Sequence, residues 1–158
     1  MARLLTLALL TASMLILTEC RKASEPAPAK LSEREVFLTT PGWNIKDYFE
    51  VMTTPAGVVT STDFLPFFDL CFFDDLNHFN ADRTFTIDEG PVKCSITYPS
   101  GTTWAFASNE TEFVFNSGQP GAKPTRILTL TATTLSYSDT TIEPDETKRV
   151  VIRIYSAK

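Results

Sequence analysis

Residues 104–115 run Trp104-Ala-Phe-Ala-Ser-Asn-Glu-Thr-Glu-Phe-Val-Phe115. Aromatic residues alternate with other residues at both ends of this stretch, as Trp104 and Phe106 on one side and as Phe113 and Phe115 on the other. This spacing puts each aromatic pair on one face of an extended strand. The centre, Ser-Asn-Glu, is composed of residues that favour turns. The stretch therefore predicts a β-hairpin.

Runs with the same period of two continue in both directions from this hairpin, with turn-forming residues between them. The chain also contains 12 Phe among its 158 residues, and aromatic residues favour strands. We expect eight or nine strands, in residues 43–51, 57–62, 76–80, 84–88, 104–106, 113–115, 128–137 (two strands) and 150–154. This pattern predicts an all-β, up-and-down antiparallel meander. Such a meander forms a barrel or a sandwich, and we favour the meandering barrel because closure removes exposed sheet edges.

The first of these strands departs from simple alternation. Trp43, Ile45, Phe49 and Val51 would share one face, but Asp47 has the same parity. Either a β-bulge changes the direction of Asp47, or its carboxylate points inward and needs a hydrogen-bonding partner. We favour a bulge or a short strand break.

The first 20 residues have the layout of an export signal. Arg3 precedes an apolar run, Leu4 to Leu17, that is shorter than the ~20 residues of a membrane-spanning helix. Leu17 and Cys20 resemble the bacterial lipoprotein signal, in which a Leu three residues before a Cys directs lipidation of that Cys. The charged Glu19 departs from the small residue preferred before the Cys. We predict a lipoprotein signal peptide over residues 1–20, with Cys20 lipidated.

Two other interpretations of the leader remain open. The signal could be cleaved after a later small residue, such as Ala23, Ala27 or Ala29, or the apolar run could stay as an uncleaved anchor. Under the lipoprotein interpretation, the chain is lipid-anchored in the cell envelope, at the outer membrane facing the periplasm or the cell surface.

Residues 21–39 are expected to be a flexible tether, because Pro26 and Pro28 interrupt regular structure there. A short helix is expected at its end, over residues 31–38, where Ser32 and Glu35 have capping-box spacing. The barrel domain is then predicted over residues 40–158.

Two cysteines remain after Cys20, namely Cys71 and Cys94. In an exported protein they are expected to form a disulfide, since disulfides persist in oxidising compartments. Two buried free thiols are the alternative. A metal site is disfavoured because Zn²⁺ sites need more Cys or His ligands than the chain offers, with His78 its only histidine.

A longer motif gives a family resemblance. The segment reads Cys71-Phe-Phe-Asp-Asp-Leu-Asn-His-Phe-Asn-Ala-Asp-Arg-Thr-Phe-Thr-Ile-Asp-Glu-Gly-Pro-Val-Lys-Cys94 and is followed by Gly101-Thr-Thr-Trp104 and Leu130-Thr-Ala-Thr-Thr-Leu135. It resembles the lipocalin-like domain of Bacteroidetes-type lipoproteins over roughly residues 40–156. Arg83 stands where that family often has Gly, so this turn can differ in type. The resemblance implies an eight-stranded antiparallel barrel in an exported, often lipidated protein, and no known ligand.

Composition and motifs exclude several functions. A net charge of -5 disfavours nucleic acid as a partner, because nucleic-acid binders cluster Lys and Arg. The sequence lacks the nucleophile, phosphate-loop and metal-ligand motifs of common enzymes, so we predict a non-enzyme without cofactors. Acidic residues gather between Asp69 and Glu89, but their spacing does not match a Ca²⁺-binding loop, and we interpret them as turn residues.

Two functions remain. In the first, the barrel interior binds a small hydrophobic ligand, because an eight-stranded barrel can hold one. The candidate lining residues are all aromatic, and ordinary core packing is the alternative for each of them: Trp43, Phe85, Trp104, Phe106, Phe113 and Tyr137. In the second, the barrel is filled, and the domain is a structural or protein-interaction module of the cell envelope.

Overall fold

The computed structural model describes residues 30–158, and within them it contains a single antiparallel sheet of nine strands. Leu31–Lys158 form one compact unit. The elements in chain order are α1 (Glu33–Thr39), β1 (Trp43–Thr53), β2 (Val59–Asp63), the 3-10 turns η1 (Leu65–Phe67) and η2 (Leu70–Phe72), β3 (Leu76–Phe79), β4 (Phe85–Asp88), β5 (Trp104–Ala107), β6 (Glu112–Phe115), β7 (Pro124–Leu130), β8 (Thr134–Ile142) and β9 (Lys148–Ala157). The prediction of an all-β, up-and-down antiparallel meander is confirmed.

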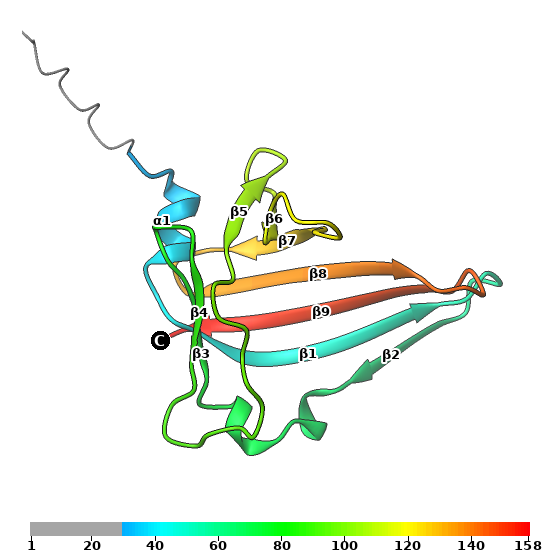
Figure 1. The fold of residues 1–158 in the computed structure, drawn as a ribbon. Helices are drawn as coiled ribbons and strands as arrows, with labels where there is room; N and C mark the ends of the chain where they lie inside the picture. The colour runs from blue at the N-terminus through cyan, green and yellow to red at the C-terminus, as the bar shows by residue number, and fades with distance from the viewer. Residues whose placement is uncertain (1–29) are drawn as a thin grey trace, which may run out of the picture. The chain divides into compact units, whose positions relative to one another are not determined.

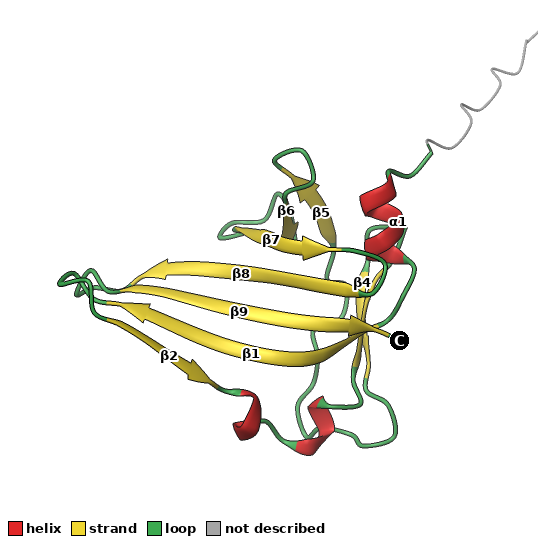
Figure 2. Cartoon of the chain, turned by 180° about the vertical axis from the view of Figure 1, so that it is seen from behind, coloured by secondary structure: helices red, strands yellow, loops and turns green. Residues whose placement is uncertain are grey.

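The strands are ordered β4-β3-β1-β9-β8-β7-β6-β5, and β2 pairs with the far half of β1. The long strands β1, β9 and β8 lie side by side, while β3 and β4 cross the end at which β9 finishes (Figures 1 and 2). The two ends of this path are connected by one isolated antiparallel bridge between Thr84 and Thr103. Around the bridge, Phe85 N donates to Thr102 O at 2.8 Å and Trp104 N donates to Arg83 O at 2.9 Å.

A bulge in β1 explains the anomaly at Asp47. Ile45 pairs with Tyr155, whereas Asp47 pairs with Ile154, so Lys46 is an extra residue in the ladder. Because side chains alternate between faces, the extra residue exchanges the faces of every residue after it. Tyr48 then lies on the same face as Ile45. The predicted bulge is confirmed. The expectation that Phe49 and Val51 share the face of Trp43 is wrong, because both follow the extra residue and lie on the opposite face.

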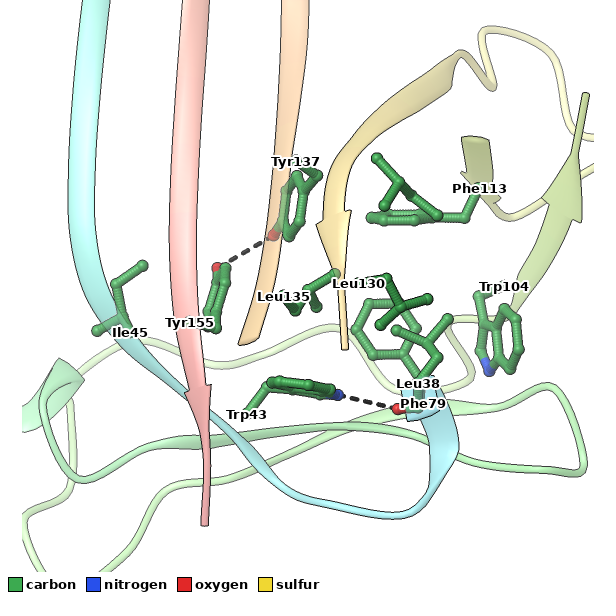
Figure 3. Packing of buried hydrophobic residues seen from close by; sticks show 11 residues of the cluster. Leu38, Trp43, Ile45, Phe79, Trp104, Phe113, Leu130, Leu135, Tyr137 and Tyr155 are labelled. Carbon is green, nitrogen blue, oxygen red and sulfur yellow. Dashed lines mark hydrogen bonds between the residues drawn. The ribbon is translucent and has the colours of Figure 1, made fainter. Parts of the chain in front are cut away.

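The hydrophobic core lies on one face of the sheet, which we call the inner face, at the end where α1 lies (Figure 3). Trp43, Phe113 and Leu135 are fully buried there, and Phe79 and Trp104 nearly so. Phe79 contacts both Trp104 and Phe113 edge-on, with ring centroids 5.7 and 5.3 Å apart. These large side chains fill this end of the sheet.

Helix α1 covers this core. Its N-cap Ser32 accepts a hydrogen bond from Glu35 N at 3.0 Å, as the capping-box spacing predicted. Leu38 is fully buried, and its carbonyl accepts a hydrogen bond from Trp43 Nε1 at 2.9 Å (Figure 3). Because Leu38 is part of the core, the helix belongs to the folded unit, which begins at Leu31 and not at residue 40 as the sequence suggested.

The turn between β3 and β4 contains Arg83 in the left-handed region, with φ of 72°. Glycine adopts this conformation without steric cost, whereas other residues do so at some expense. The side chain of Arg83 pairs with Glu35 of α1 at 2.5 Å and lies over the Trp104 ring at 4.6 Å. These two contacts offset the backbone cost and connect the turn to the helix.

Candidate functional site

Along β8 and β9, away from the core, the inner face is hollow. Three pockets of about 150, 310 and 380 Å³ open there. The first and second share Ile87 and Tyr98, the second and third share Phe85 and Phe115, and the first and third share Arg153. The three pockets are therefore adjoining parts of one cavity system, and aromatic side chains contribute to the walls of all three.

Arg153 of β9 is the cation inside this system, and its charge is already balanced. Its Nη1 donates to Asp139 Oδ2 of β8 at 2.5 Å. The other oxygen of Asp139 accepts from Thr125 Oγ1 at 2.6 Å. The Arg153 guanidinium also lies over the rings of Tyr48 and Tyr137, 5.2 and 5.6 Å from their centroids. The hydrogen bond and the stacking on two rings hold the half-buried Arg153 guanidinium in one orientation.

Two tyrosines form the boundary between the core and the cavity. The hydroxyls of Tyr137 and Tyr155 are 3.0 Å apart, and their rings are stacked with centroids 5.5 Å apart (Figure 3). Burial raises the pKa of Tyr137 well above its ordinary value, and burial also raises the pKa of Tyr155. Both phenols therefore remain neutral at physiological pH and pair as hydrogen-bonding groups.

Asp75 is a buried carboxylate in the wall of the first pocket. Asp75 is 4% exposed, and Tyr98 Oη donates a hydrogen bond to Asp75 Oδ2 at 2.5 Å. Its Oδ1 is buried and accepts no hydrogen bond from any residue in the described part of the chain. Burial raises the pKa of the Asp75 carboxyl, the charges of Asp74 and Glu89 act in the same direction, and the hydrogen bond from Tyr98 opposes them.

The position of Asp75 depends on two long-range contacts. The Cys71–Cys94 disulfide joins the segment before β3, which carries Asp75, to the segment before β5, which carries Tyr98. Asn44 of β1 then donates from Nδ2 to the backbone oxygen of Asp75 at 3.1 Å. The carboxylate and its tyrosine partner are thus brought together by a covalent link and by a buried amide.

An aromatic cover lies over the same pocket. The turns η1 and η2 place Phe68 and Phe72 in its wall, opposite Tyr48 of β1. The ring centroids of Phe68 are 5.1 Å from Tyr48 and 5.5 Å from Phe72. Next to this cover, Phe67 and Leu70 point to solvent and are 76% and 80% exposed. The pocket therefore has an aromatic lining and an apolar rim.

The structure separates the six aromatic residues that the sequence proposed for ligand binding. Trp43, Trp104 and Phe113 lie in the packed core, and Phe106 packs against it. Phe85 lines the second and third pockets, and Tyr137 lines the third. Two of the six side chains thus reach the cavity.

Most residues of the site were not identified from the sequence, and among them are its polar and charged groups Tyr48, Asp75, Tyr98 and Arg153. Tyr48 was missed because the bulge reverses its face, and Arg153 because a charged residue between Ile152 and Ile154 resembles a solvent-facing position. Asp75 was interpreted as one of the turn residues between Asp69 and Glu89. That role belongs to Asp74, whose Oδ2 accepts from Val92 N at 2.8 Å.

The predicted Cys71–Cys94 disulfide is confirmed. The proposed lipidation site Cys20 and the leader lie outside the described residues. Within residues 30–158, no three His, Cys, Asp or Glu side chains are placed to hold a metal ion. In the same range, no helix combines the length and apolar character needed to cross a bilayer.

Comparison of the chain with protein-family models, with curated proteins and with solved structures found no match.

Proposed function

We propose that this protein is exported to the cell envelope, lipid-anchored through Cys20 at the outer membrane, and binds a small hydrophobic ligand inside a lipocalin-like barrel. Export is supported by the leader pattern and by the Cys71–Cys94 disulfide, since such bonds persist in oxidising compartments. No catalytic step is part of the proposal.

The strand order supports the barrel. The eight strands from β4 to β5 form one continuous antiparallel path, and the Thr84–Thr103 bridge joins its two ends. In this interpretation β2 is an extension of β1 beyond the ring. Eight strands enclose an interior that can hold one small ligand, and α1 closes the end that the core fills.

The observation that carries ligand binding is the aromatic cavity system beyond Tyr137. A filled interior would have indicated a structural module, whereas here the side chains leave adjoining pockets of about 150, 310 and 380 Å³. Pockets for small ligands are typically concave and mainly apolar, with a few polar groups that fix orientation. Phe85, Ile87 and Phe115 supply the apolar wall, and Arg153 and Asp75 supply the polar groups.

Mass spectrometry of organic extracts from the gently purified protein tests the proposal. We expect a co-purified hydrophobic compound that is lost in Ile87→Trp, because a larger side chain there narrows two pockets. Thr86→Trp is the matched control, since Thr86 is the exposed neighbour on the same strand and should leave the compound bound. If wild type, Thr86→Trp and Ile87→Trp all lack a ligand, the alternative of a structural or interaction module is favoured.

Metabolic labelling with a radioactive fatty acid tests the anchor. We expect label in the wild-type chain and none in Cys20→Ala. Equal labelling of both proteins would contradict lipidation at Cys20 while leaving the ligand proposal intact.

A further inference from the structure

The charges around the first pocket are not balanced. Arg153 is neutralised by Asp139 at 2.5 Å, and no Lys or Arg of the described chain forms an ion pair with Asp75. Asp74 and Glu89 lie close enough to Asp75 to raise its pKa, and the exposed Lys93 opposes them only weakly. The wall formed by the disulfide-linked segments therefore favours a positive group over a negative one.

Asp75 also lacks a hydrogen-bond donor. Tyr98 satisfies Oδ2, but Oδ1 is buried without a donor among the described residues. Buried carboxylate oxygens without partners are rare because each costs free energy. A donor supplied by a ligand would remove that cost, and Asp75 lies in the pocket wall where such a ligand would sit.

The other walls are suited to a cation. Tyr48, Phe68, Phe72 and Tyr98 line the pocket together with Asp75. Aromatic faces attract ammonium groups through the ring quadrupole, and the attraction grows when the site is shielded from water. A carboxylate within an aromatic enclosure can bind a protonated amine both through the rings and through its N–H donors. A quaternary ammonium lacks these N–H donors.

We propose that the Asp75 pocket binds the protonated primary amine of an amphiphile, whose alkyl chain extends into the adjoining pockets lined by Phe85 and Phe115. This inference rests on the proposed function, because it assigns a head group to the hydrophobic ligand. The Tyr98 hydroxyl orients the carboxylate, and Asp75 is the group that selects the amine.

Isothermal titration calorimetry of the purified protein with three probes that have carbon chains of equal length tests the inference. The probes are n-octylamine, 1-octanol and octanoate, which are cationic, neutral and anionic at neutral pH. We expect n-octylamine to bind at least about tenfold more tightly than 1-octanol, because hydrogen bonds to charged groups are the strong ones. Octanoate should bind most weakly of the three.

Two variants locate the preference. Asp75→Asn should abolish the advantage of n-octylamine over 1-octanol. Asp69→Asn removes an exposed carboxylate beside η2 and should retain the advantage. Circular dichroism spectra and melting curves of both variants establish that they are folded.

The outcomes distinguish this inference from the proposed function. Tightest binding of octanoate would overturn the inference, assign the head-group site to Arg153 and leave ligand binding standing. An amine preference that survives in Asp75→Asn would also overturn it. If none of the three probes binds to the wild type, both the inference and the hydrophobic-ligand proposal fail.

Discussion

At the residue scale, two side chains occupy costly states that neighbouring groups offset. Arg83 adopts a left-handed backbone that favours glycine, and its guanidinium contacts Glu35 and the Trp104 ring. Asp75 keeps a carboxylate in a buried wall, and among residues 30–158 only Tyr98 donates a side-chain hydrogen bond to it. Residues held in unfavourable states often serve structure or function. Here Arg83 stabilises the fold, and Asp75 belongs to the proposed site.

Two substitutions separate the backbone strain at Arg83 from the stabilising contacts of its side chain. Arg83→Ala keeps the left-handed strain and loses the contacts, so it should lower the free energy of unfolding by about 1–2 kcal/mol. Arg83→Gly loses the same contacts but relieves the strain, so it should be less destabilising. Urea denaturation of the three proteins checks the order. If Arg83→Gly were the less stable variant, backbone strain at this turn would be ruled out.

Asp75 should make stability depend on pH. Its pKa is raised in the folded state, chiefly by burial, so the folded protein binds the proton on this carboxyl more tightly than the unfolded chain does. That contribution is complete below the ordinary Asp pKa of about 4 and is lost as the pH rises through the folded-state pKa. Asp75→Asn removes this loss, so its melting temperature should exceed that of the wild type at pH 7. The difference should shrink toward pH 4, as thermal melts across this range would show.

At the element scale, helix α1 covers the filled end of the inner face, and irregularities in β1 and β7 change which side chains face inward. The helix contributes Leu38 to the core, and the bulge at Lys46 directs Tyr48 into the cavity. A second irregularity in β7, between Ile127 and Thr129, leaves Leu128 48% exposed, while Ile127 and Leu130 are buried. Each extra residue changes which side chains face inward.

These irregularities limit what the sequence could predict. Strand positions and the hairpin at residues 104–115 followed from period-two alternation, and Ser32 with Glu35 predicted the helix start. The cavity did not follow from the sequence. The break in alternation at Asp47 indicated a bulge in the first strand, but it did not show that Tyr48 would turn inward. Alternation also cannot detect that the Cys71–Cys94 bridge brings Asp75 to Tyr98. Aromatic residues also occur in both the packed core and the hollow region, so an aromatic residue in the sequence does not by itself indicate which of the two it belongs to.

Helix α1 provides a matched pair of substitutions. Leu38→Ala should lower the free energy of unfolding by about 3 kcal/mol, because it removes a fully buried side chain and leaves a void. Val36→Ala, on the same helix but 42% exposed, should change it by less than about 0.5 kcal/mol. Chemical denaturation measures both. Equal effects would mean that α1 does not pack on the core in solution.

At the scale of the whole molecule, one end of the inner face is filled and the rest is hollow. Trp43 and Leu135 are fully buried at the filled end, whereas Arg153 and Asp75 lie farther along in cavity walls. The Cys71–Cys94 bridge compensates for the missing packing around the hollow part, since it joins two long segments that contain little regular structure. A domain that keeps an interior space needs such support.

Removal of this bridge should therefore have a large effect. Replacement of Cys71 and Cys94 by Ser should lower the free energy of unfolding by about 3 kcal/mol, mainly through the greater freedom of the unfolded chain. The free energy of unfolding of the wild type, measured in the presence of a reductant, should match that of the double variant. This comparison is the control for effects of the serine side chains themselves. If oxidised and reduced wild type had the same urea midpoint, the bond would contribute nothing to stability.

The bulge at Lys46 has a consequence for how this sequence can diverge. The Lys46 side chain is exposed, so most amino acids are compatible with the position, but its presence determines the orientation of all later residues of β1. Deletion of this one residue would turn Phe49 inward and Tyr48 outward, together with every residue that alternates with them. Selection should thus preserve the number of residues between Ile45 and Tyr48 more strictly than their identity. An insertion or deletion in this strand would mark a relative whose cavity has a different lining.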